Sequence, residues 1–196
     1  VYGQQWFANP FHGLILGGVA DAISKTDYCL DLFVQSDVDI SLTAEWRARR
    51  LDGIIVLPMR LSEETISAID RTEVPVVVID GWWESTSVRY ITWDNAAGGA
   101  LAAEHLIAQG HQRLGFLGAA ADDYTSSERL KGYREAIRRH GLELNGAWVA
   151  QGDWTYARAY ATASRWFSSP EHPTGVFAPS DTLAIGVYAA GLDLGL

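Results

Sequence analysis

Apolar, β-rich runs alternate with segments of helical periodicity along almost the whole chain of 196 residues. The predicted strands are 28–36, 53–57, 75–80, 88–93, 113–118, 147–151 and 174–178, and the predicted helices are 10–26, 40–51, 62–71, 95–109, 127–140, 155–168 and 181–191. Apolar strands joined by helices predict parallel sheets that are covered on both faces. The fold class is therefore α/β.

One step breaks this alternation, because the predicted strand 75–80 is followed by the strand 88–93 with no helix between them. Such an interruption of the strand–helix rhythm marks the place where the chain leaves one lobe for another. We therefore expect an N-terminal lobe over 1–92 and a C-terminal lobe over 93–196.

Composition excludes some classes of protein. No run of eighteen apolar residues is present, so a membrane span is excluded. The formal net charge of −9 argues against a nucleic-acid surface on this chain, because phosphate binding needs clustered Lys and Arg. The single cysteine, Cys29, lies in an apolar run, which predicts a buried core thiol and favours a reducing cytoplasm.

Several residues are predicted to begin or end helices. Asn9 precedes Pro10 and reads as an N-cap followed by proline at the first helical position. Gly110 and Gly141 stand where the helices 95–109 and 127–140 need a left-handed residue to stop.

Ligands in open parallel sheets bind beyond the carboxyl ends of the strands. The residues in those positions are polar or aromatic: Asp80, Trp93, Asp94, Thr125, Ser126, Arg129, Asp153, Trp154, Ser180 and Asp181. Carboxylates and a guanidinium can chelate vicinal hydroxyls, while tryptophan faces pack against the C–H patches of a sugar ring. This mixture suits a polyol better than an anion or a lipid.

Each candidate also has a purely structural interpretation. Asp80 can end its strand in an Asx-turn, and Asp181 can N-cap the last helix. Arg129 can be a solvated charge on its helix. Trp154 and Phe11 can be core side chains.

Three motifs in order carry a family resemblance: 93–118 (WDNAAGGALAAEHLIAQGHQRLGFLG), 127–133 (SERLKGY) and 152–154 (GDW). They resemble the effector-binding core of the lactose/galactose repressor family, over nearly the whole chain from about Asn9 onward. The resemblance implies two Rossmann-like lobes of the periplasmic-binding-protein-like type I fold, which close on a small molecule, usually a sugar. Relative to that family the chain is expected to be incomplete at both ends, lacking most of the first strand, the helix-turn-helix headpiece and a later strand.

The resemblance also assigns roles to residues. Arg129 matches the arginine that reaches the ligand's hydroxyls, and Trp154 matches an aromatic residue placed against the ligand, which is Phe in the family's purine binder. The resemblance implies further correspondences: Asp80 after its strand, Trp93 at the lobe crossing, Thr125 one turn before the arginine, Ser180 and Asp181 where many relatives have Asn-Asp, and Asn9 and Phe11 in an Asn-Pro-Phe motif.

We therefore interpret the chain as the sugar-sensing core of a cytoplasmic transcriptional regulator. The resemblance implies a homodimer, a mono- or disaccharide effector, and operator DNA bound through a headpiece outside this chain. A periplasmic sugar-binding protein of a transporter is one alternative, and a sugar- or nucleoside-processing enzyme is another. We expect no enzyme, cofactor or metal site, because no catalytic triad is present and His105 and His111 cannot share a helix face.

Overall fold

The computed structural model describes residues 10–33, 51–57, 63–85 and 87–196. The chain divides into two compact units, Val1–Ile91 and Thr92–Leu196. Both contain a parallel sheet with helices, which confirms the predicted α/β class. Among the described helices there is none whose length and apolar content would suffice to span a bilayer.

In its described residues the first unit has a three-stranded parallel sheet in the order β1-β2-β3, formed by β1 (Ile54–Val56), β2 (Val76–Ile79) and β3 (Val88–Ile91). Helix α4 (Glu63–Asp70) contributes Ile66 and Ile69 to the core beneath this sheet. Helix α2 (Pro10–Ile23) begins at the predicted proline, whereas its expected cap, Asn9, lies outside the described residues.

The step from β2 to β3 has no helix, as predicted, although the two strands are parallel. The connection between β2 and β3 contains Trp83, whose side chain is 9% exposed and packs in the same core as Val76 and Val88. The hydroxyl of Tyr90 donates a hydrogen bond of 2.7 Å to the Trp83 carbonyl oxygen, and the two rings meet edge to face. Trp83 thus contributes to the core beside a connection that contains no helix.

Two predictions for the segment after α2 are wrong, the strand at 28–33 and the burial of Cys29. Residues 28–33 form no strand, and residues 34–36 of that predicted strand lie outside the described part of the chain, as does nearly all of the predicted helix 40–51. A strand needs hydrogen bonds to a neighbour, and in the described residues β1 pairs only with β2. Cys29 belongs to this segment and is exposed, so the expectation of a buried thiol fails with the strand.

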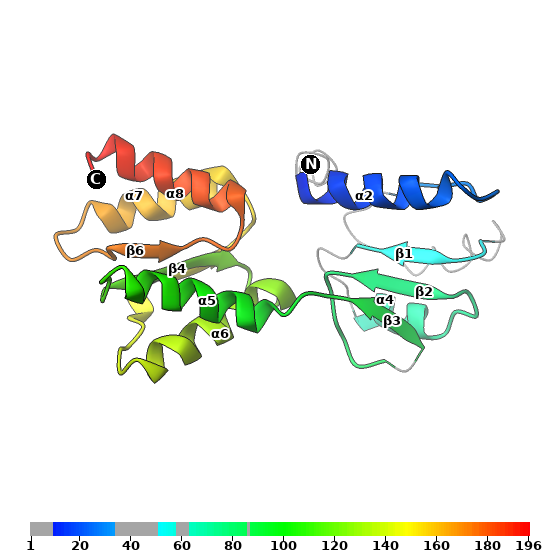
Figure 1. Ribbon diagram of the computed structural model, residues 1–196, viewed down its shortest axis with the longest axis horizontal. Coiled ribbons are helices and arrows are strands. Elements are labelled where there is room, and N and C mark those ends of the chain that lie inside the picture. Colours follow the sequence, from blue (N-terminus) through cyan, green and yellow to red (C-terminus); the bar gives the residue numbers. More distant parts are fainter. Residues whose placement is uncertain (1–9, 34–50, 58–62, 86) are drawn as a thin grey trace. The chain divides into compact units, whose positions relative to one another are not determined.

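The second unit has a parallel sheet in the order β5-β4-β6, formed by β4 (Leu114–Ala119), β5 (Val149–Gly152, after the short 3-10 helix η1, Gly146–Trp148) and β6 (Gly175–Phe177). Helices α5 (Asn95–Ala108) and α6 (Tyr124–Arg139) cover one face, and α7 (Tyr156–Phe167) and α8 (Asp181–Asp193) cover the other (Figure 1). Every residue of β4 is buried, because this central strand has core on both sides.

Two glycines end helices as the sequence predicts. Gly110 follows α5 with φ of 90°, and Gly141 follows α6 with φ of 70°. Both angles lie in the left-handed region that favours glycine, so these two predictions are confirmed.

Helices α5 and α6 approach so closely that glycine is required on both. A Cβ atom at Gly99 would lie 1.9 Å from the carbonyl oxygen of Arg129, and one at Gly132 would lie 1.8 Å from that of Ala96. No side chain separates the two backbones at this crossing. The close contact therefore sets the position of Arg129 relative to the first turn of α5.

Candidate functional site

A hollow of about 520 Å³ lies in the second unit at the carboxyl end of β6 and the amino end of α5. Its wall is formed by Trp93, Asp94, Asn95, Ala97, Gly98, Leu101, Arg129, Phe177, Ala178, Pro179, Ser180 and Asp181. This is the edge of a parallel sheet where ligands generally bind. Five of the residues that the sequence places beyond strand ends line it: Trp93, Asp94, Arg129, Ser180 and Asp181.

Arg129 is held at the wall of the hollow by groups from two other elements. Its Nε donates a hydrogen bond of 2.9 Å to Oδ1 of Asn95, at the start of α5, and its Nη1 donates to the carbonyl oxygen of Pro179, after β6. The side chain is half-buried. An arginine oriented in this way differs from a solvated helix charge, because two acceptors fix its plane.

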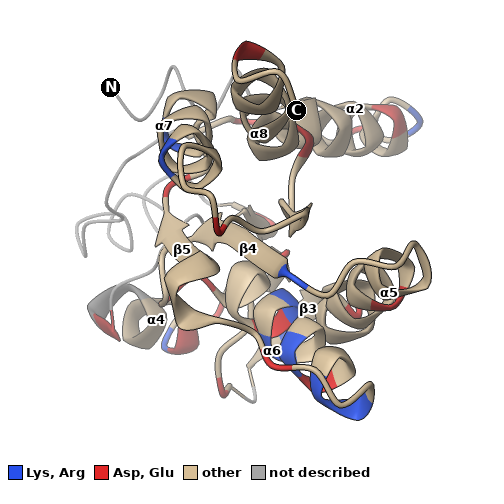
Figure 2. Ribbon diagram, turned by 90° about the vertical axis from the view of Figure 1, so that its left-hand side faces the viewer, with Lys and Arg blue, Asp and Glu red and all other residues tan. Residues whose placement is uncertain are grey.

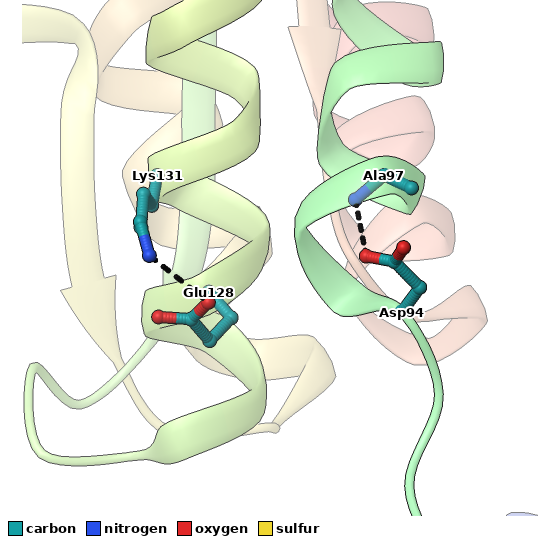
Figure 3. Close-up of polar contacts among 4 residues, drawn as sticks. All are labelled: Asp94, Ala97, Glu128 and Lys131. Atoms are coloured by element: carbon teal, nitrogen blue, oxygen red, sulfur yellow. Dashed lines mark hydrogen bonds and ion pairs between the residues drawn. The ribbon is translucent and has the colours of Figure 1, made fainter.

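The other basic side chains of α6 are more exposed than that of Arg129. Lys131, Arg134, Arg138 and Arg139 are all exposed, and Figure 2 shows that α6 carries a concentration of basic residues. Lys131 pairs with Glu128 at 3.4 Å on the same helix (Figure 3), and Arg139 pairs with Glu104 of α5 at 2.9 Å. Exposed pairs of this kind stabilise a protein little, so we assign these charges to the solvated surface.

Asn95 is a site residue that our sequence reasoning did not single out. Its side chain is only 4% exposed, Oδ1 accepts the bond from Arg129, and Nδ2 is buried with no hydrogen-bond partner among the described residues. Its neighbour Asp94 caps α5, since the carboxylate accepts a bond of 2.9 Å from the backbone N–H of Ala97 (Figure 3). The sequence carried no signal for this role, because an asparagine in a first helical turn is usually exposed and the burial of Asn95 depends on tertiary packing.

Ser180, not Asp181, caps the last helix. The Ser180 hydroxyl accepts a bond of 3.3 Å from the backbone N–H of Leu183, while Asp181 is the first residue of α8 and is exposed. The capping interpretation of Asp181 is therefore wrong by one residue. As a first-turn carboxylate, Asp181 instead complements the positive end of the helix dipole.

Trp154 and Thr125 do not line the hollow. Trp154 precedes α7, and its half-buried ring packs against the core that contains Leu117, Ala159 and Leu183. Its indole Nε1 donates a bond of 3.0 Å to Oδ2 of Asp123. The structural interpretation of Trp154 as a core side chain thus holds for much of its ring.

Asp123 was also missed by the sequence reasoning. Its Oδ1 accepts a bond of 2.8 Å from the backbone N–H of Ser126 and so caps α6, which begins at Tyr124 instead of the predicted residue 127. This earlier start places Thr125 inside the first turn, where it is 6% exposed. An aspartate ahead of a predicted helix was the usable signal for this cap.

Trp93 is 46% exposed beside the hollow, at the entrance to α5. Three predicted residues, Asp80, Phe11 and Asn9, belong to the first unit. Asp80 directly follows β2 with φ of 61°, a left-handed conformation that aspartate adopts more readily than most residues. Phe11 is half-buried in the first turn of α2, and Asn9 lies outside the described residues.

Comparison with known proteins identifies the family. The family described as "Periplasmic binding proteins and sugar binding domain of LacI family" matches residues 2–196, and the chain belongs to it. A curated relative, the HTH-type transcriptional repressor PurR of Photobacterium profundum, is 28% identical over 92% of this chain and 55% of its own length. PurR of Vibrio campbellii is 33% identical, again over 92% of this chain and 55% of its own length.

The solved "transcriptional regulator CelR-cellobiose complex" superposes with a TM-score of 0.88 at 28% identity, covering 98% of this chain and 60% of that one. The chain spans little more than half the length of the curated relatives that it matches. The matching family and structures agree with the resemblance that the three sequence motifs carry.

Proposed function

We propose that this chain is the effector-binding core of a transcriptional regulator and that its effector is a sugar. The observation that carries the proposal is the oriented guanidinium of Arg129 at the wall of a hollow that also presents the exposed ring of Trp93. A fixed cation binds hydroxyls by charge-assisted hydrogen bonds, and an aromatic face packs against the C–H groups of a pyranose. The complex of a similar regulator with cellobiose supports this ligand class.

Ser180 and Asp181 complete the polar wall on the side of α8. Asp181 offers a carboxylate that can accept from sugar hydroxyls. Ser180 stands where the family resemblance predicts an asparagine, and its hydroxyl oxygen already accepts the capping bond from Leu183. We infer that this position selects a sugar different from those bound by relatives with asparagine here.

The remaining predicted ligand contacts are part of the same proposal. They are Trp154 before α7, Thr125 in the first turn of α6, and Asn9, Phe11 and Asp80, whose ligand contacts are proposed from the family resemblance. A ligand that makes better contacts in one arrangement of the protein shifts the population toward that arrangement. We propose that this shift alters operator binding by a headpiece in a homodimeric, cytoplasmic protein, and that the chain itself catalyses no reaction.

The alternative function is a periplasmic sugar-binding protein, since the family description includes such proteins. The curated relatives named above are both transcriptional repressors, which favours the regulator. The upstream coding sequence separates the two functions: a helix-turn-helix supports a regulator, and a secretion signal supports a transport protein.

The test is a thermal-shift screen of the full-length protein against mono- and disaccharides, pentoses, polyols and purines, because a ligand that binds only the folded state raises the unfolding midpoint. A stabilising sugar is then titrated into the variants Arg129→Ala and Arg134→Ala. The first should lose about 1.5–3 kcal/mol of binding free energy, the value of a hydrogen bond to a charged group.

The Arg134→Ala variant removes an exposed arginine of the same helix and should bind as the wild type does. Equal affinity of both variants would remove Arg129 from the site. A response to purines alone would overturn the sugar assignment.

A further inference from the structure

The two carboxylate oxygens of Asp123 serve two different loops. Oδ1 accepts from the backbone N–H of Ser126 at 2.8 Å and caps α6, the helix that carries Arg129. Oδ2 accepts from the indole Nε1 of Trp154 at 3.0 Å, in the loop between β5 and α7. One side chain therefore joins the loop after β4 to the loop after β5.

The indole bond determines which edge of the Trp154 ring faces the core. The ring packs against an apolar core that contains Leu117 and Leu183, and such contacts are not directional. The N–H is the only strong donor on the indole, so its acceptor selects one orientation of the ring from those that packing permits. Asp123 supplies that acceptor from a partly buried position.

We propose that Asp123 is a positioning residue of the effector site, which holds the Trp154 ring in one orientation while it fixes the start of the Arg129 helix. The inference rests on the proposed function for its consequence in ligand binding, but the positioning itself is a property of the ligand-free protein.

The surroundings of the carboxylate support this role. Burial raises the pKa of Asp123, while the bonds from Ser126 and Trp154 and the charge of Arg129 oppose the rise and the charge of Asp122 adds to it. The titrating group and its indole partner are thus coupled, so the resonance of the Trp154 N–H should report the protonation of Asp123.

The variant Asp123→Asn separates the two bonds. Asparagine caps helices about as well as aspartate, so its amide oxygen can keep the bond from Ser126. Its amide nitrogen is a donor, however, and would face the indole N–H of Trp154, which is also a donor. The variant should therefore retain α6 and lose only the link to Trp154.

The experiment is NMR of the ligand-free protein labelled with 15N-tryptophan, with the Trp154 indole signal assigned by its absence in Trp154→Phe. In the wild type this signal should shift as the pH is raised through the titration of Asp123. In Asp123→Asn it should move upfield, lose that pH dependence and show exchange broadening on the μs–ms timescale as the ring samples a second orientation. In the matched control Asp122→Asn it should stay sharp and still titrate, with a lower midpoint because the charge of Asp122 no longer raises the pKa of Asp123.

An indole signal that neither moves nor broadens in Asp123→Asn would overturn the proposal. The second measurement titrates cellobiose into wild type and Asp123→Asn, and we expect about tenfold weaker binding in the variant, the equivalent of one directed hydrogen bond. Equal cellobiose affinity would overturn the role of Asp123 in the effector site. If the wild type does not bind cellobiose, the proposed function is in question, whereas the NMR result alone decides the positioning.

Discussion

The crossing of α5 and α6 makes a sharp prediction for two adjacent glycines. Gly99 is buried, and a Cβ there would lie 1.9 Å from the carbonyl oxygen of Arg129. Gly98 is exposed, and a Cβ there would have no atom within 4 Å apart from its own helix and chain neighbours. The same change, Gly→Ala, therefore has opposite consequences at neighbouring positions.

The magnitude follows from the geometry. Cβ atoms are essentially never found closer than 3.0 Å to another atom, so the helices must separate by about 1 Å in Gly99→Ala. Overpacking costs about 1–3 kcal/mol, and the upper value applies here because both groups are backbone and no side chain can rotate away. Alanine favours a helix by about 1 kcal/mol over glycine, so Gly99→Ala should lower the free energy of unfolding by about 2 kcal/mol in total. Gly98→Ala should raise it by about 1 kcal/mol.

The assay is thermal and urea unfolding of both variants, followed by far-UV circular dichroism. For a chain of this size each kcal/mol corresponds to roughly 2–4 °C in Tm, so Gly99→Ala should lower Tm by about 4–8 °C and Gly98→Ala should raise it by about 2–4 °C. Equal stability of the two variants would refute the close helix crossing. Because the displaced oxygen belongs to Arg129, Gly99→Ala should also weaken sugar binding.

Three further outcomes are expected. Ser180→Ala should lower the free energy of unfolding by about 1 kcal/mol, because it removes the cap of α8. Asp181→Ala should lower it by less, about 0.3–1 kcal/mol, because it removes only an interaction with the helix dipole. If urea unfolding ranks the two variants in the reverse order, Asp181 is the cap. Gly110→Ala should destabilise the protein by about 1–2 kcal/mol, because φ of 90° is strained for alanine, and a neutral effect on Tm would contradict that conformation. The pKa of Asp123 is raised above its unfolded value, so the folded protein binds more protons at this carboxylate than the unfolded protein does. The free energy of unfolding of the wild type should therefore fall as pH rises from about 4 through the folded pKa, and that of Asp123→Asn should lack this decrease. Parallel pH profiles of the two proteins would argue against the raised pKa.

The sequence predicted which helices and strands form better than it predicted where they begin and end. It placed α5 within one residue and β6 within its predicted range, but it started α6 three residues late, because the cap Asp123 was not recognised. The failure at 28–36 has a different cause. An apolar run predicts that a segment can form a strand, whereas pairing depends on a neighbouring strand that the run itself does not specify.

The candidate site was predicted in part. Five expected residues line one hollow, because the carboxyl ends of parallel strands meet at one edge: Trp93, Asp94, Arg129, Ser180 and Asp181. Asn95 was missed because its burial depends on α6 packing across it. The contributions of Trp154, Thr125, Asp80, Asn9 and Phe11 to ligand binding remain predictions.

What the sequence determined by itself was local: the alternation of strands and helices, and the helix stops at Gly110 and Gly141. Periodicity and left-handed backbone angles are properties of a few consecutive residues, so they can be read directly from the chain. The tertiary structure alone decided the partners, joining Arg129 to Asn95 across 34 residues and to Pro179 across 50, and Trp154 to Asp123 across 31. These contacts depend on the strand order β5-β4-β6 and on the close crossing of α5 and α6, and no short stretch of the chain specifies either of them.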